Sequence, residues 1–219
     1  MNNSIDLILW DLDRTLCLHN LIFHQDAPIA VGDAAIEMGA TEEAYEIAKT
    51  SYTGQRRSVI AVAERFNLDP DELFQIYYKH LKDNFLTPNR KLIEAFAVSP
   101  YQNGILTNAS RLWIERALSK LELIGYFNDD YLFGYDERKQ HKKIDGRDVL
   151  KKLVEGQGYN CKNVMVVDDA TKNLSIPKEL GMQTVLITNG EEYQSCDWVD
   201  QYHNIPLDVL RSISLKRAV

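Results

Sequence analysis

Four short polar clusters hold the residues whose types and spacing suit catalysis. They are Asp11-Leu12-Asp13-Arg14-Thr15, Thr107-Asn108, Lys142-Lys143 and Asp168-Asp169. A carboxylate can attack phosphorus to form an acyl phosphate, and a second carboxylate two residues on can handle the leaving-group proton. A hydroxyl, backbone N–H groups and a lysine can hold and neutralise a phosphoryl group. The distant acidic pair, together with the first aspartate, makes a hard oxygen site suited to Mg²⁺. The set favours phosphoryl transfer.

Most of these clusters follow segments that read as buried strands. We expect strands over Ile5–Trp10, Gly104–Leu106, Tyr131–Tyr135, Val164–Val167 and Thr184–Ile187. Their continuous apolar character is typical of parallel strands covered on both faces, and helical patterns separate them. The fold class predicted is α/β, with a doubly wound, mainly parallel, Rossmann-like sheet. Open sheets of this class bind ligands at the carboxyl ends of their strands, where the polar clusters occur.

The segment between the first two strands has a different pattern. Val59, Val62, Ala63 and Phe66 follow the spacing of one helix face, and Asp69 before Pro70 is a helix-start signal. We therefore expect a core domain of residues 1–16 and 89–219 and a helical domain of residues 17–88. Within the core, Ser110 should begin one helix, and Pro177 should kink or split a helix over Thr171–Leu180.

These clusters resemble the motifs of haloacid dehalogenase superfamily hydrolases, over nearly the whole chain. The matching residues are Asp11, Asp13 and Thr15 in DxDxT, Thr107 after Ile105-Leu106, a lysine before a helix, and Asp168-Asp169. The insert takes the place of the family's helical cap. The stretches Val167–Asn173 and Leu180–Met182 look like the pyrimidine 5′-nucleotidase branch. Three features depart from the family pattern: Lys142-Lys143 precedes Ile144 rather than proline, Pro177 interrupts a helix, and Arg14 replaces a small or amide residue.

The resemblance implies a role for each site residue. Asp11 would be the nucleophile that becomes phosphorylated, and Asp13 the acid and base. Thr107 and the Asn108 N–H would hold the phosphoryl group, with Lys143, preferred over Lys142, offsetting its charge. Mg²⁺ would take the Asp11 carboxylate, the Asp13 backbone carbonyl and Asp168, with Asp169 direct or through water.

Composition narrows the choice of partner. The net charge is −7, which does not suit binding of a nucleic-acid polymer or an anionic membrane surface. No apolar run approaches the roughly 18 residues of a membrane-spanning helix, and the N-terminus has no basic segment of a secretory signal. The three cysteines are far apart, which indicates free thiols and a cytoplasmic location. No pattern indicates an oligomeric state.

The function predicted is Mg²⁺-dependent hydrolysis of a small phosphate monoester, with nucleoside 5′-monophosphates favoured, pyrimidine before purine. Tyr52, Arg56 and Arg57 are candidate substrate contacts in the insert. The alternative interpretation, that they form a solvated helix end, has equal weight. Alternatives are a phosphomutase, a sugar-phosphate or phosphoglycolate phosphatase, and a non-catalytic phosphate-binding protein. Asp13 argues against a dehalogenase, because a halide leaves without a proton. A phospho-receiver module would have its acidic pair first in the chain, whereas here it comes last.

Overall fold

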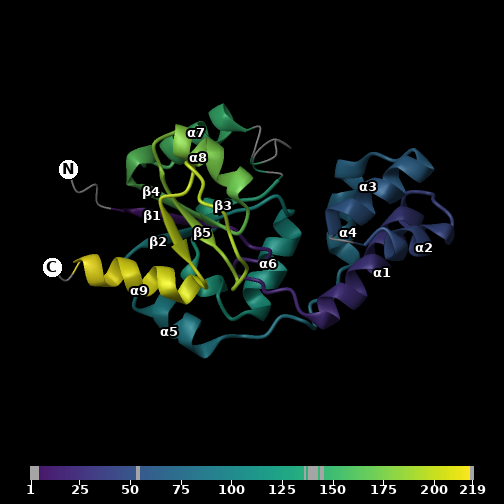
Figure 1. Ribbon diagram of the computed structural model, residues 1–219, viewed down its shortest axis with the longest axis horizontal. Helices are drawn as coiled ribbons and strands as arrows, with labels where there is room; N and C mark the ends of the chain where they lie inside the picture. Colours follow the sequence, from purple (N-terminus) through teal and green to yellow (C-terminus); the bar gives the residue numbers. More distant parts are fainter. Residues whose placement is uncertain (1–4, 53–54, 136, 138–142, 144–145, 218–219) are drawn as a thin grey trace. The chain divides into compact units, whose positions relative to one another are not determined.

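The computed structural model describes residues 5–52, 55–135, 137, 143 and 146–217. The chain divides into two compact units, one of Met1–Leu18 with Pro88–Val219 and the other of His19–Thr87. The first unit is an α/β domain and the second is helical (Figure 1). None of the described helices has both the length and the apolar character that crossing a membrane requires.

The described residues of the α/β unit form a sheet of six parallel strands in the order β3-β2-β1-β4-β5-β6. The strands are β1 (Leu7–Trp10), β2 (Gln102–Leu106), β3 (Leu132–Phe133), β4 (Val164–Asp168), β5 (Gln183–Ile187) and β6 (Gln201–His203). This order confirms the doubly wound parallel sheet predicted from the sequence. The chain builds one half outward from β1 through β2 and β3, and the other through β4, β5 and β6. The order therefore reverses between β1 and β4, which is where such sheets bind ligands.

The register places the ends of the central strands together. Trp10 pairs with Ile105 of β2 and with Val167 of β4, so the residue after β1 lies beside Leu106 and Asp168. Both β1 and β4 are buried along their whole length. This burial explains why their sequences are apolar without a break. A strand with one face in solvent would instead alternate apolar and polar residues.

Helices cover both faces of this sheet. They are α5 (Arg90–Ala97), α6 (Arg111–Lys120), α7 (Arg147–Gly156), α8 (Ser175–Glu179) and α9 (Pro206–Arg217). Leu7 and Leu9 share a buried cluster with Leu150 and Val154 of α7. Trp10 packs edge-on against Phe96 of α5, at 5.4 Å between ring centroids. Figure 1 shows α7 and α8 on one side of the sheet and α5 and α9 on the other.

Several local predictions can be compared with the structure. The Ser110 side chain accepts a hydrogen bond from the Trp113 N–H, which confirms the start of α6. The predicted helix over Thr171–Leu180 is a 3₁₀ turn at Thr171–Leu174 followed by α8, so the break precedes Pro177. Pro177 lies in the first turn of α8, where a helix does not need its missing N–H. The third strand is shorter than expected, and neither α5 nor β6 was predicted.

The helical unit consists of α1 (Leu21–Glu37), α2 (Glu43–Thr50), α3 (Gln55–Phe66) and α4 (Pro70–His80). The Asp69 side chain accepts hydrogen bonds from the N–H groups of Asp71 and Glu72, so the predicted cap of α4 is present. In α3, Val59, Val62 and Ala63 are buried as the spacing predicted, whereas Phe66 is only half-buried. The described residues of 19–87 contain no strand.

Candidate active site

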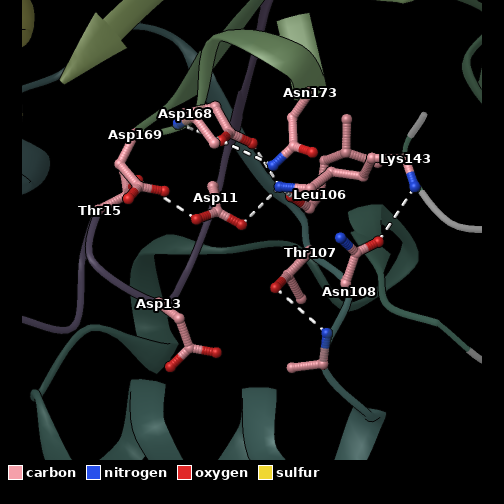
Figure 2. A network of polar contacts seen from close by, with 12 residues as sticks. Asp11, Asp13, Thr15, Leu106, Thr107, Asn108, Lys143, Asp168, Asp169 and Asn173 are labelled. Carbon is pink, nitrogen blue, oxygen red and sulfur yellow. Dashed lines mark hydrogen bonds and ion pairs between the residues drawn. The ribbon is translucent and has the colours of Figure 1, made fainter. Parts of the chain in front are cut away.

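Three acidic side chains meet where β1 and β4 end (Figure 2). Asp11 directly follows β1, and Asp168 is the last residue of β4. The Asp11 N–H donates to the Val167 carbonyl at 2.8 Å, which extends the pairing of the two strands into the site. One carboxylate oxygen each from Asp11, Asp168 and Asp169 lies within 4.8 Å of the others. Three oxygen donors at this separation form a candidate site for a hard divalent cation.

A lysine bridges two of these carboxylates. Lys143 Nζ donates to Asp11 Oδ1 at 2.6 Å and to the Leu106 carbonyl at 3.2 Å. It also donates to Asp168 Oδ2. The Lys143 side chain is 2% exposed, so the ammonium is buried with its partners. Lys142, the alternative weighed from the sequence, lies outside the described residues.

Burial and neighbouring negative charges raise the pKa of two carboxylates of this cluster, Asp11 and Asp169. Burial raises the pKa of Asp11 well above 3.8; Lys143 lowers it, and Asp168 and Asp169 raise it again. Burial and Asp168 likewise raise the pKa of Asp169 to about 6, against the opposing charges of Lys143 and Arg14. Burial alone would lower the pKa of Lys143, but Asp11 and Asp168 outweigh it and the net shift is upward. Even with Lys143 and Arg14 counted, three ionised carboxylates leave an excess of negative charge that a divalent cation would relieve.

Three hydrogen-bond donors orient two of these carboxylates. Asp168 Oδ1 accepts hydrogen bonds from the Ala170 N–H at 2.9 Å and from Asn173 Nδ2 at 3.0 Å. Thr15 Oγ1 donates to Asp11 Oδ2 at 3.3 Å. Asn173 was not predicted as a site residue. Its signal was its place in the nucleotidase-like stretch, five residues after Asp168.

Arg14 lies at the rim of the cluster and links three loops. Its Nε contacts Asp169 Oδ2 at 2.9 Å, and its terminal nitrogen contacts Glu191 Oε1 at 2.7 Å. Its backbone has φ 62°, and its carbonyl accepts a hydrogen bond from Asn189 Nδ2 at 2.8 Å. Arg14 stands where the family pattern has a small or amide residue. It therefore places a cation against Asp169, the most exposed carboxylate of the cluster.

The second polar cluster lies beside the carboxylates. Thr107 is buried, and its Oγ1 accepts from the Ala109 N–H at 3.3 Å. Asn108 Oδ1 accepts from the Lys143 N–H at 3.0 Å, so this side chain holds the backbone that carries the lysine. This contact was not predicted from the sequence, which assigned Asn108 through its backbone N–H alone.

The carboxylate of Asp13 lies apart from the cluster that Lys143 forms with Asp11, Asp168 and Asp169. Figure 2 shows its carboxylate pointing away from Asp11 and Lys143. Its Oδ1 accepts a hydrogen bond from Trp113 Nε1 of α6 at 3.2 Å. Asp11 and Asp13 thus follow the same strand but have different surroundings, which suits two different chemical roles.

Known proteins share this architecture. A family model described as haloacid dehalogenase-like hydrolase matches residues 8–187. No curated protein sequence matched. Among solved structures, a HAD phosphatase from Thermococcus onnurineus is 18% identical with TM-score 0.61, covering 96% of this chain and 98% of its own. A putative beta-phosphoglucomutase from Thermotoga maritima is 15% identical with TM-score 0.62, covering 98% and 100%.

A third relative is the L-2-haloacid dehalogenase from Xanthobacter autotrophicus with chloropropionic acid covalently bound. It is 16% identical with TM-score 0.58, covering 96% of this chain and 99% of its own. At these identities the three structures share the fold with this chain and carry three different named activities. The family model spans most of the chain, and the fold agrees with it: this protein belongs to the haloacid dehalogenase-like hydrolase family.

Proposed function

We propose that this protein is a Mg²⁺-dependent phosphatase that hydrolyses a small phosphate monoester through a phosphorylated Asp11. The observation that carries the proposal is the cluster of Asp11, Asp168 and Asp169 around buried Lys143. A phosphate ester is itself anionic, so three carboxylates would repel it unless a divalent cation offset their charge. The three oxygen donors fit Mg²⁺, which when bound would neutralise developing charge on the phosphoryl group.

The chain's own residues supply the remaining chemistry. Asp11 attacks phosphorus while Asp13 gives a proton to the leaving oxygen as its bond to phosphorus breaks. Asp13 then takes a proton from the water that attacks phosphorus, and the bond from phosphorus to Asp11 breaks. Lys143 favours the ionised form of Asp11, which is the form that attacks. Thr107 Oγ1 and the Asn108 N–H are the proposed donors to the phosphoryl oxygens.

Asp13 favours a phosphatase over a dehalogenase. An alkoxide leaving group needs a proton, whereas a halide departs without one. Asp13 lies two residues after the nucleophile and accepts a hydrogen bond from Trp113. It can therefore supply the proton that the alkoxide of a phosphate ester needs. A phosphomutase uses the same groups, and it differs by returning the phosphoryl group to the substrate instead of to water.

The helical unit is the proposed source of substrate selectivity. We infer that residues 17–88 act as a cap that excludes water from the phosphorylated site. Tyr52 of this unit is half-buried, its hydroxyl is 3.0 Å from His24 Nδ1, and burial raises its pKa to about 12. Its phenol therefore stays neutral and can hydrogen-bond a sugar or base. Arg56 and Arg57 lie in α3, and their side chains are outside the described residues.

The favoured substrates are nucleoside 5′-monophosphates, pyrimidine before purine, on the resemblance of Val167–Asn173 and Leu180–Met182. A cytoplasmic location is proposed as well, because Cys17, Cys161 and Cys196 are free thiols.

A substrate screen tests the proposal. Purified protein is offered nucleoside monophosphates, sugar phosphates, phosphoglycolate and 2-haloacids, each with Mg²⁺ and with EDTA, and Asp11→Asn is the control. Phosphate release that requires Mg²⁺ and Asp11 is expected. Sugar phosphates or phosphoglycolate that exceed every nucleotide by about tenfold in kcat/KM, about 1.4 kcal/mol of transition-state preference, would overturn the nucleotide assignment alone. Halide release without phosphate release would overturn the phosphatase assignment.

A further inference from the structure

The indole of Trp113 makes a hydrogen bond to the carboxyl group of Asp13. Trp113 is fully buried on α6, and its Nε1 donates to Asp13 Oδ1 at 3.2 Å. The two residues are 100 positions apart in the chain. No sequence motif connects them. The contact forms because α6 begins at Arg111, a few residues after β2 ends at the same edge of the sheet.

We propose that Trp113 is a positioning residue that fixes the Asp13 carboxyl group for proton transfer to the leaving oxygen. The proposal rests on the phosphatase function proposed above. It adds a residue outside the four polar clusters and gives it a specific task. Trp113 does not touch the reacting atoms in this scheme and acts through Asp13.

The indole N–H also bears on which oxygen of the Asp13 carboxyl group carries the transferred proton. An indole N–H is a donor only, so the oxygen that it contacts must act as an acceptor. Oδ1 therefore accepts from Trp113 whether or not the carboxyl carries a proton. A carbonyl oxygen is a better acceptor than a hydroxyl oxygen, so this contact favours Oδ2 as the oxygen that carries the proton and gives it to the ester oxygen as the bond from phosphorus to that oxygen breaks. In the second step Oδ2 takes a proton from the attacking water.

The surroundings of Trp113 keep this donor in place. The torsion that rotates a carboxyl group is soft, so an unrestrained Asp13 would sample many orientations. Trp113 itself is 0% exposed, and the Arg116 guanidinium carbon lies 4.8 Å from its ring centroid. Its backbone N–H is held at the start of α6 by the Ser110 carbonyl at 3.1 Å. A fixed indole thus restricts the orientation of the Asp13 carboxyl group, and proton transfer depends on that orientation.

The matched pair Trp113→Phe and Trp10→Phe separates this task from a structural one. Trp10 is also fully buried, and its Nε1 donates to Asn103 Oδ1 at 3.0 Å. Each variant therefore loses one buried indole hydrogen bond and keeps an aromatic ring. Folding of each is verified by circular dichroism and thermal unfolding before kinetics.

The kinetic readout is kcat/KM with Mg²⁺ for two esters of different leaving group. One is a nucleoside 5′-monophosphate, or the best alkyl phosphate of the screen, whose alkoxide needs a proton. The other is 2,4-dinitrophenyl phosphate, whose phenolate departs without one. Since general acid catalysis contributes about 10²- to 10⁴-fold, we expect Trp113→Phe to lose roughly tenfold or more on the alkyl ester and less than about threefold on the dinitrophenyl ester. Trp10→Phe should change both esters by the same factor.

A double-variant cycle tests whether Trp113 acts through Asp13. In an Asp13→Asn background, Trp113→Phe should cause no further loss on the alkyl ester. An equal loss on both esters, or a full further loss in the Asp13→Asn background, would overturn the role of Trp113 while leaving the phosphatase function intact. Wild-type protein that hydrolyses neither ester would overturn the phosphatase function, and the role of Trp113 with it.

If Trp113→Phe does not fold, NMR of the ¹⁵N-labelled protein tests the same contact. The chain has three tryptophans, so ¹⁵N-labelled protein gives three indole N–H signals. Asp13→Ala should shift the signal of one of them and speed its exchange with solvent. Three unchanged indole signals would overturn the proposal.

Discussion

Replacing Asp169 by asparagine should stabilise the protein when no divalent cation is bound. Asp169 lies beside Asp168 with a side chain that is 17% exposed, and burial and Asp168 raise its pKa from 3.8 to about 6. Above pH 6 the folded protein therefore holds an ionised group that it disfavours. Asparagine has the same shape without the charge, so Asp169→Asn removes this cost.

The magnitude follows from the two pKa values. They differ by about two pH units, and each unit corresponds to about 1.4 kcal/mol, so the expected gain for Asp169→Asn is about 3 kcal/mol at pH 8 in EDTA. The sign also sets the pH window. Between about pH 4 and 6 the folded state binds more protons than the unfolded state, so wild-type stability falls as pH rises. The advantage of Asp169→Asn should grow across that window and be nearly absent below it.

Urea unfolding of both proteins at pH 4 and pH 8, in EDTA, measures the effect. The exposed Asp197→Asn variant is the control, because it makes the same change in net charge away from the cluster. Free Mg²⁺ at one hundred times its Kd should add about 2.7 kcal/mol to the wild type, and less to Asp169→Asn. An Asp169→Asn protein less stable than wild type at pH 8 in EDTA, or one with an equal gain at pH 4, would refute the reasoning.

Three further outcomes are expected. Asp11→Asn should keep the fold by circular dichroism and lose phosphatase turnover; substantial steady-state activity would remove Asp11 from the role of nucleophile. Lys143→Met should lower kcat by about 10²- to 10³-fold because it removes a charged donor from the site, and a larger loss in Lys142→Met would reverse the choice of lysine. Dialysis against EDTA should abolish phosphate release and Mg²⁺ should restore it, so full activity in EDTA would exclude the proposed metal site.

The central strands and the start of α6 could be predicted because their signals are local. Buried parallel strands such as β1 and β4 need continuous apolar residues, and the carboxyl ends of such strands share one edge. Asp11 and Asp168 could therefore be expected at the same edge from the sequence alone. Ser110 is likewise a local cap for the helix that follows it.

Other features depend on contacts that have no local signal. Strand β6 is a short, half-buried segment of polar and aromatic residues, and it pairs only because β5 offers an edge. The contact from Trp113 to Asp13 and the contact from Lys143 to Asn108 join segments 100 and 35 residues apart. Asn173 reaches Asp168 only because a 3₁₀ turn follows β4. Such side chains could be assigned only once the chain was folded.

Trapping the phosphorylated enzyme tests the central claim most directly. Wild-type protein is mixed with Mg²⁺ and the best phosphate ester, quenched in acid during turnover, digested, and its peptides are analysed by mass spectrometry. We expect the mass of one phosphoryl group on the peptide that contains Asp11, located at Asp11 by fragmentation and absent from Asp11→Asn. Active turnover with no phosphorylated Asp11, or with the phosphoryl group on another residue, would contradict the account.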